Sequence, residues 1–314
     1  MDAVRMAKRM GFLCSPLDDP RRLQIRQDQF IEAYQRRGAV DDIIEVVHEL
    51  TKLRAGNSFE IFRSQTLFEQ PVMQSIQHTH DRDYPLHPLI RLPAPAIPDR
   101  LFGELLRERR SCRTFGGDAL SLPQLSTLLF GGNGETGRLT TCLEDENPIE
   151  ASLRSLPSAG ALHPTDVFVV ALREGELARG LYHYDVQEHA LEVVKEWSDT
   201  EIGALFRAFP IHPQPVNLAG ASVILFMASR FWRPRAKYGP RGYRYCLQEA
   251  GAACQNLCLT ATALGLPHVV LGGFYDDEVH KVLEMDGVDQ AVITSIGVGT
   301  RARTKEEEKT YAGF

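Results

Sequence analysis

The stretch YCLQEAGAACQNLCLTATALGLPHVVLGGF, residues 245 to 274, decides the fold of this chain. Its apolar and small residues recur every three or four positions, the repeat of an α-helix: Leu247, Ala250, Gly251, Cys254, Leu257, Cys258, Ala261 and Leu264. The opposite side is also small or apolar, which predicts a central, fully buried helix over residues 246 to 266. After Pro267, HVVLGG (268 to 273) predicts a buried strand that ends in two glycines.

Further elements surround this helix and strand. Short apolar runs predict strands at VFVVAL (167 to 172), SVILFMAS (222 to 229) and AVITSIGVG (291 to 299), and alternation around a polar turn predicts a hairpin at RGLYHYDVQEHALEVV (179 to 194). Two flanking helices are predicted at DRLFGELLRERRS (99 to 111) and LPQLSTLLFGG (122 to 132). We therefore expect an α+β domain over residues 98 to 314, with an antiparallel or mixed sheet and the small-residue helix at its centre.

The first 97 residues have a different pattern. Residues 20 to 54 predict helices, and five prolines between residues 85 and 98 predict an extended, irregular arm. We expect a small helical extension and a proline-rich arm over residues 1 to 97.

Composition bounds the class of protein. The 314 residues are 43% hydrophobic and 24% charged, as in a soluble globular chain. A formal net charge of -6 disfavours nucleic-acid binding. The sequence shows neither a signal peptide nor a membrane helix, and its six cysteines form no CxxC pair, so we expect a cytoplasmic protein with reduced thiols.

Several motifs favour structural roles. GGNGETG (131 to 137) contains GxGxxG, but it follows a helix-like segment and leads into RLTTCLEDENP, so a glycine-rich loop is favoured over a dinucleotide site. Cys254 and Cys258 lie one turn apart with no metal-ligand partner at the right spacing, and His78 with His80 is too weak a pattern, so we expect no metal. The acidic stretch over residues 131 to 155 is expected to be a long loop, as a lid or a docking element.

Three other motifs suit a flat, phosphorylated ligand. RRSCRTF (109 to 115) supplies guanidiniums and a hydroxyl beside a helix end, although a solvated basic turn would look the same by itself. RSLPSAGALHP (154 to 164) supplies small residues for close backbone approach, and LGGF (271 to 274) supplies two glycines after a strand.

In this order and followed by SIGVG, these motifs resemble the nitroreductase-fold flavoproteins over about residues 98 to 301. Within that superfamily PSAGALHP, VVHELTK (46 to 52) and KYGPRGYRY (237 to 245) are similar to the SagB-type azoline dehydrogenases. Those enzymes oxidise thiazoline or oxazoline rings in ribosomally made peptides. The resemblance implies the nitroreductase-like fold, FMN as cofactor, a heterocyclised precursor peptide as substrate, and cyclase or dehydratase proteins as candidate partners.

The resemblance also implies a homodimer with two sites across its interface, which would make the helix over 246 to 266 the dimer core. The phosphate, ribityl chain and pyrimidine edge of FMN would fall to Arg110, Ser111 and Arg113, with Arg301 joining the phosphate site. Four residues of the partner subunit would cover the flavin ring: Pro157, Ser158, Ala159 and Gly160. The backbone N–H groups of Gly272 and Gly273 would lie near the N5 side of the ring.

The basic stretch RFWRPRAKYGPRGYRY, residues 230 to 245, contains the implied catalytic pair, Lys237 and Tyr238. Oxidation of an azoline needs a base for a ring proton. We expect crowding by Arg235, Arg241 and Arg244 to lower the pKa values of both groups; the alternative is that these arginines cap and solvate the next helix. Two alternative functions remain: an NAD(P)H-dependent nitro or quinone reductase, and a flavin-free docking subunit of a peptide-modifying complex.

Overall fold

The computed structural model describes residues 47–48, 51–52, 84, 86–141, 149–210 and 216–302. Residues 47 and 48 are helical, and the rest of the helices predicted over 20 to 54 lies outside the described residues, apart from the turn at 51 and 52. The His78 and His80 pair also lies outside them.

A seven-stranded sheet with the order β1-β6-β5-β4-β7-β9-β8 forms the centre of the described chain, and all of its neighbouring strands pair antiparallel. The strands are β1 (Leu89–Arg91), β4 (Thr165–Ala171), β5 (Gly180–Asp185), β6 (Ala190–Glu196), β7 (Val223–Arg230), β8 (His268–Leu271) and β9 (Gln290–Val298). The strands and the hairpin expected from the sequence are all present, and the expected α+β content with an antiparallel sheet is confirmed.

Six α-helices lie in the described part of the chain. They are α6 (Phe102–Glu108), α7 (Leu122–Asn133), α8 (Asp199–Arg207), α9 (Trp232–Tyr238), α10 (Gly242–Ala263) and α11 (Asp276–Val282). Helix α7 begins with a reciprocal capping box between Ser121 and Gln124, and α8 begins with the same device between Ser198 and Glu201. These side chains satisfy backbone N–H groups that the first turn of a helix leaves without partners.

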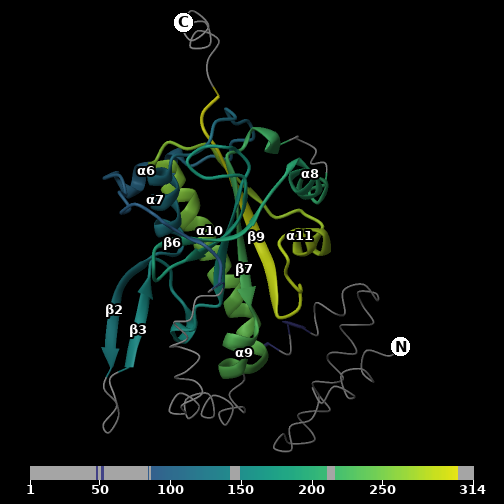
Figure 1. Cartoon of the computed structure of the whole chain (residues 1–314). Coiled ribbons are helices and arrows are strands. Elements are labelled where there is room, and N and C mark those ends of the chain that lie inside the picture. The colour runs from purple at the N-terminus through teal and green to yellow at the C-terminus, as the bar shows by residue number, and fades with distance from the viewer. Residues whose placement is uncertain are drawn as a thin grey trace, which may run out of the picture.

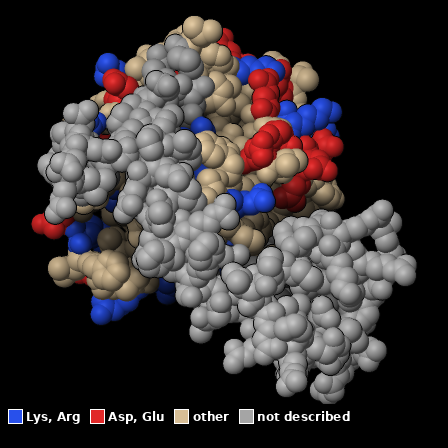
Figure 2. Space-filling view, turned by 90° about the horizontal axis from the view of Figure 1, so that it is seen from below, with Lys and Arg blue, Asp and Glu red and all other residues tan. Residues whose placement is uncertain are grey.

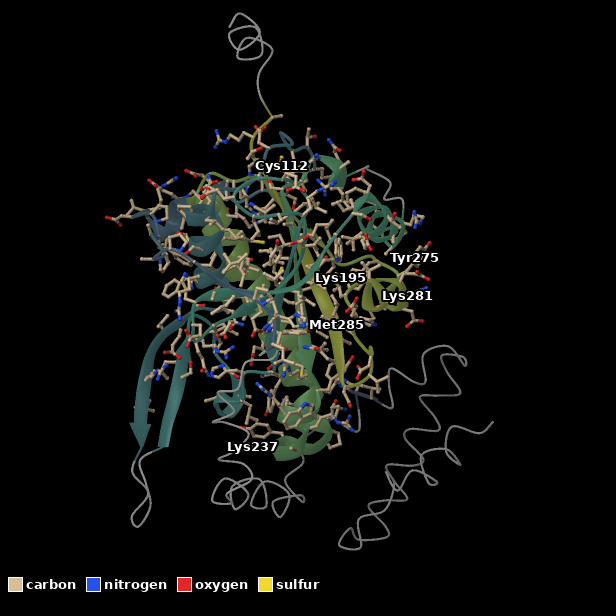
Figure 3. The ribbon with its side chains drawn as sticks, in the orientation of Figure 1. Cys112, Lys195, Lys237, Tyr275, Lys281 and Met285 are labelled. Atoms are coloured by element: carbon tan, nitrogen blue, oxygen red, sulfur yellow. The ribbon has the colours of Figure 1, made fainter. Side chains whose placement is uncertain are left out.

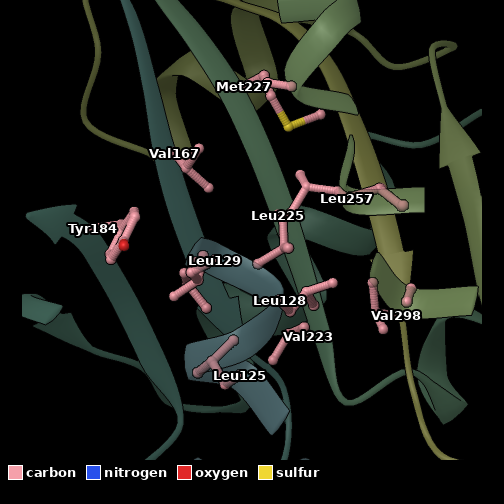
Figure 4. Close-up of a cluster of buried hydrophobic side chains, with 14 of the residues drawn as sticks. Leu125, Leu128, Leu129, Val167, Tyr184, Val223, Leu225, Met227, Leu257 and Val298 are labelled. Carbon is pink, nitrogen blue, oxygen red and sulfur yellow. The ribbon is translucent and has the colours of Figure 1, made fainter. Parts of the chain in front are cut away.

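The sheet separates two hydrophobic cores, with helices on both faces (Figure 1). On one face α7 and α10 pack through Leu128, Leu129 and Leu257 against Leu225 and neighbouring strand residues (Figure 4). On the other face α8 and α11 contribute Leu205 and Val279 to a core with Phe226. The position of α10 against the sheet follows from its small residues, since they permit close approach.

Two sequence expectations about this region were wrong. The stretch over 131 to 155 is not a long loop: β2 (Glu135–Thr141) and β3 (Ile149–Arg154) pair antiparallel in a hairpin apart from the main sheet (Figure 1). Thr140, Thr141 and Ile149 extend this ladder, which β-branched residues favour. GGNGETG is not a glycine-rich loop either: it ends α7 and starts β2, so no helix follows it.

Helix α10 is only partly buried within one chain. It starts at Gly242, four residues earlier than predicted, and Leu247, Gly251 and Gln255 on one side are exposed. The expectation of full burial was therefore wrong for the single chain, because a side that is only weakly polar in sequence has no cover here. The basic stretch before it also contains a helix, α9.

The proline-rich arm reaches the domain core. Its residues 89 to 91 form β1 beside β6, and Leu92 is buried in the core under α7. The carbonyl of Pro93 accepts a hydrogen bond from the Ser126 hydroxyl of α7. The boundary between residues 97 and 98 stays a prediction.

Within the described ranges, none of the helices has the length and apolarity to span a bilayer. Likewise no group of three or more candidate metal ligands occurs among those residues. Seen from the end of the molecule at which α9 lies, the described surface shows basic side chains with acidic ones among them (Figure 2).

Candidate active site

The first half of the candidate site is a basic segment after α6. Three backbone hydrogen bonds fix it: Cys112 N donates to His268 O at 2.8 Å, Gly116 N donates to Thr300 O at 2.9 Å, and Asn217 N donates to Arg113 O at 2.9 Å. The segment therefore runs along the start of β8 and the end of β9. This arrangement explains why residues separated by nearly two hundred positions share one end of the sheet.

Several guanidiniums gather at this end without carboxylate partners. Arg110 and Ser111 are exposed, and Arg113 is half-buried. Arg301 donates through Nε to Gly265 O at 3.2 Å, which ties it to the same end. Among the described residues none of these arginines forms an ion pair. Such a set of guanidiniums without carboxylate partners suits a phosphate group.

The two glycines after β8 are exposed and open. Gly272 and Gly273 follow Leu271, and no atom lies within 4 Å of the position that a Cβ would take at either one. The backbone can therefore approach a flat ligand there without a side chain in the way. This accessibility fits the expected role beside a flavin ring.

The second half of the site is formed by two segments that the sheet brings together. Strand β4 starts where its neighbour β7 ends, since Thr165 pairs with Ser229, and Arg230 N donates to Pro164 O at 2.9 Å. The segment before β4, which contains the PSAG motif, therefore meets the segment after β7, which contains Lys237 and Tyr238.

The contact between these segments centres on Gly160. Its φ of 65° lies in the left-handed region that favours glycine. A Cβ placed on Gly160 would lie 2.6 Å from Nζ of Lys237 and 2.6 Å from Oη of Tyr238. The polar ends of both side chains thus converge over this one glycine, and the structure brings the motif expected to cover the ring next to the expected catalytic pair.

The electrostatics of the pair differ from the sequence expectation. Lys237 is buried, and burial lowers the pKa of its amine from 10.5 to about 8. Burial also raises the pKa of Tyr238, with a further contribution from Tyr245. The expected lowering of the Tyr238 pKa was wrong, and the Lys237 shift comes from desolvation rather than from arginine charges.

Arg241 and Arg244 have other partners. Arg241 Nη1 donates to Thr51 O at 3.1 Å, Arg244 Nε donates to Thr51 Oγ1 at 2.7 Å, and Arg244 Nη2 donates to His48 O at 2.7 Å. They hold a turn of the N-terminal extension rather than the catalytic pair. Sequence reasoning missed Thr51 and His48, and their one signal was that they fall inside the VVHELTK motif.

Polar groups next to the PSAG motif (157 to 160) hold it by hydrogen bonds. The His163 amide donates to Ser158 Oγ at 2.9 Å, and the His163 ring contacts Ser152 O at 2.9 Å. Burial and the Arg154 charge lower the pKa of His163 to about 3, so the ring is neutral and donates its Nε2–H to the carbonyl. Glu249 of α10 accepts from the Thr165 amide at 3.2 Å. Sequence reasoning missed both residues, and their one signal was that His163 falls inside the motif over 154 to 164 and Glu249 inside the stretch over 245 to 274.

The two halves of the site lie at opposite ends of α10. Lys237 precedes the start of this helix and Arg301 contacts Gly265 just after its end. With 22 residues, α10 is about 33 Å long. Cys112 and Lys237 accordingly lie at opposite ends of the molecule (Figure 3). A single chain therefore does not join the arginine half to the Lys237 half.

The family model described as the nitroreductase family matches residues 106–300, and the chain belongs to this family. The fold and the oxidoreductase class expected from the sequence are thereby confirmed.

Three curated relatives show which members of the family this chain is similar to. A protein of Methanocaldococcus jannaschii that is named as a nitroreductase is 30% identical over 196 residues, which are 62% of this chain and 90% of that protein. The microcin B17-processing protein McbC of Escherichia coli is 32% identical over 137 residues, 42% of this chain and 49% of McbC. The trifolitoxin-processing protein TfxB of Rhizobium leguminosarum is 29% identical over 147 residues, 46% of this chain and 39% of TfxB. The matches to the two peptide-processing proteins thus cover half or less of their lengths, and the similarity to this group is confirmed.

A solved structure agrees on the fold. A protein of Anabaena variabilis, named as a nitroreductase, superposes with a TM-score of 0.58 at 23% identity, over 81% of this chain and 45% of that chain. At this identity the likeness concerns architecture alone.

Proposed function

We propose that this protein is an FMN-dependent dehydrogenase that oxidises thiazoline or oxazoline rings to thiazole or oxazole in a ribosomally made peptide. The observation that carries the proposal is the convergence of Lys237 Nζ and Tyr238 Oη on Gly160 of the PSAG motif. The similarity to two proteins named for processing microcin B17 and trifolitoxin supports a peptide substrate.

The residues fit FMN at the arginine half. Arg110, Arg113 and Arg301 would bind its phosphate, with Ser111 on the attached chain and the open backbone of Gly272 and Gly273 beside the ring. Residues 157 to 160 of a second copy would cover the ring. When bound, FMN supplies a two-electron acceptor, which removal of two hydrogens from a ring requires.

The protein supplies the proton chemistry. Because burial lowers its pKa to about 8, Lys237 is neutral near neutral pH far more often than an exposed lysine, so Nζ can accept the ring proton. Because its pKa is raised, Tyr238 stays protonated and can orient the ring by donating a hydrogen bond from Oη. The pair thus combines a base with a donor.

A homodimer would complete the site. The two halves lie at opposite ends of α10, and one side of α10 is open at Leu247 and Gly251. Two copies that pack antiparallel along this side would place the arginine half of one beside the Lys237 half of the other. Helix α6 has no buried residue and exposes Phe102 and Leu106, so it offers further apolar surface. Sedimentation of the purified protein tests this arrangement.

The test of function is direct. Purified protein should be yellow and release FMN on denaturation, and a co-expressed heterocyclised peptide should lose about 2 Da per oxidised ring, the mass of two hydrogens. A colourless protein that also fails to bind added FMN would instead indicate a flavin-free docking subunit. Whether cyclase or dehydratase proteins must be present is answered by adding them to the same assay.

One observation favours a second candidate, an NAD(P)H-dependent nitro or quinone reductase. The relative named as a nitroreductase is matched over 90% of its length. Such a reaction does not need a base for a C–H proton, so the Lys237 and Tyr238 pair favours the dehydrogenase. Rapid NADPH turnover with quinones, together with no azoline oxidation, would reverse this order.

A further inference from the structure

We propose that the turn containing His48 and Thr51 is a positioning element for the Lys237 and Tyr238 pair, and that Arg241 and Arg244 attach it to the domain. The inference rests on the proposed function for the identity of the pair. It assigns to Val47, His48 and Thr51 of the N-terminal extension a role in turnover that the flavin motifs do not require.

The attachment is specific in its geometry. Thr51 is buried, with 4% of its surface exposed, although it belongs to the extension. Its hydroxyl donates to Val47 O at 2.6 Å and accepts from Arg244 Nε at 2.7 Å. A hydroxyl has one donor and two acceptor positions, so both bonds can form together. The Thr51 hydroxyl thus closes the turn internally and also binds it to Arg244, next to the bonds that Thr51 O and His48 O accept from Arg241 and Arg244.

The hydrogen bonds from Arg241 and Arg244 to the turn are charge-assisted. Both guanidiniums donate to oxygen atoms of the turn, and charge-assisted hydrogen bonds are about twice as strong as neutral ones. Within the described part of the chain neither Arg241 nor Arg244 forms an ion pair with a carboxylate. The turn is therefore their principal partner there.

A row of ring contacts connects the turn to the catalytic pair. The Arg241 guanidinium lies 5.7 Å from the centroid of the Tyr245 ring. The Tyr245 ring meets the Tyr238 ring edge-to-face, with centroids 5.0 Å apart. The hydroxyl of Tyr238 in turn lies over Gly160, and the centroid of the Tyr238 ring is 5.0 Å from Lys237 Nζ. A shift of the turn therefore moves Arg241, frees Tyr245 and loosens Tyr238.

The key variant is Thr51→Val, which keeps the shape of the side chain and removes its hydroxyl. We expect kcat on a heterocyclised peptide to fall ~10-fold while KM stays within ~2-fold and FMN content is unchanged, since a small misplacement of a reacting group mainly affects the chemical step. Thr51→Ser should restore wild-type kcat, because it returns the hydroxyl. Thr136→Val is the matched control, since Thr136 Oγ1 also donates to a backbone carbonyl, Leu153 O at 3.2 Å, in the separate hairpin.

A second readout does not depend on turnover. Competitive amine labelling followed by mass spectrometry measures how fast the buried Lys237 reacts. Thr51→Val should raise this rate several-fold, and Thr51→Ser and Thr136→Val should not. If Thr51→Val does not fold, Arg241→Lys provides the same comparison, because it keeps the charge and loses the planar contact with Tyr245.

The outcomes separate the two proposals. If the wild type oxidises no azoline but Lys237 labelling rises in Thr51→Val, the proposed function fails and the positioning role stands. If the wild type is active and Thr51→Val lowers only the melting temperature, with kcat and labelling unchanged, the turn is a structural attachment and the inference is overturned.

Discussion

Replacing Gly160 by alanine tests whether Lys237 and Tyr238 act together over the PSAG loop. The added Cβ would lie 2.6 Å from Lys237 Nζ and 2.6 Å from Tyr238 Oη. Favourable contact needs about 3.5 Å, so each polar end must retreat by roughly 0.9 Å. Both are ends of flexible side chains, so the fold can adapt, but a displacement of about 1 Å can cost about 10²-fold in rate.

The backbone contributes a separate and smaller cost. Gly160 has a φ of 65°, and an alanine in this region costs about 1 to 2 kcal/mol of stability. Gly117 is the matched control, because its φ is 88° and nothing lies within 4 Å of its Cβ position. We expect Gly160→Ala and Gly117→Ala to lower the free energy of unfolding by similar amounts.

The assay compares turnover on a heterocyclised peptide with denaturant unfolding for both variants. Only Gly160→Ala should lose about 10²-fold in kcat, and it should keep its flavin absorbance. Equal kcat values for Gly160→Ala and Gly117→Ala would refute the reasoning, because the space above Gly160 would then have no part in the reaction.

Three other predictions use the remaining site residues. Arg110→Ala should bind FMN about 10-fold to 150-fold more weakly, since a hydrogen bond to a charged group contributes about 1.5 to 3 kcal/mol. Flavin fluorescence measures the affinity for FMN, and excess FMN should partly restore activity. Lys237→Ala and Tyr238→Phe should keep the bound flavin spectrum but slow azoline oxidation by about 10²-fold to 10⁴-fold, the usual range for lost acid–base catalysis, and near-normal turnover by both would exclude them as the proton-transferring pair. For the wild type, kcat/KM should rise with pH up to about 8 and then level off, because burial lowers the Lys237 pKa from 10.5 to about 8 and only the neutral amine accepts a proton; this step should be absent from the residual activity of Lys237→Ala.

The sequence was sufficient for those elements whose signal is local. The three- and four-residue repeat of α10, the apolar runs of β4, β7, β8 and β9, and the hairpin of β5 with β6 each depend on short-range periodicity. The arginine motif over 109 to 115 was also found from local composition, and its role in binding a phosphate stays a prediction. The hairpin of β2 and β3 was missed, because its residues are mostly polar and a loop has a similar composition.

What only the tertiary structure decided is which residues meet. Lys237 and Gly160 are far apart in sequence, and they meet because the antiparallel register pairs Thr165 with Ser229. The direction of the Tyr238 pKa shift was also beyond the sequence: the nearby arginines point to Thr51 and His48, so burial dominates instead of charge. Local pattern determines which segments are helices and strands, whereas strand register and the length of α10 determine distances between side chains, and the proton chemistry depends on those distances.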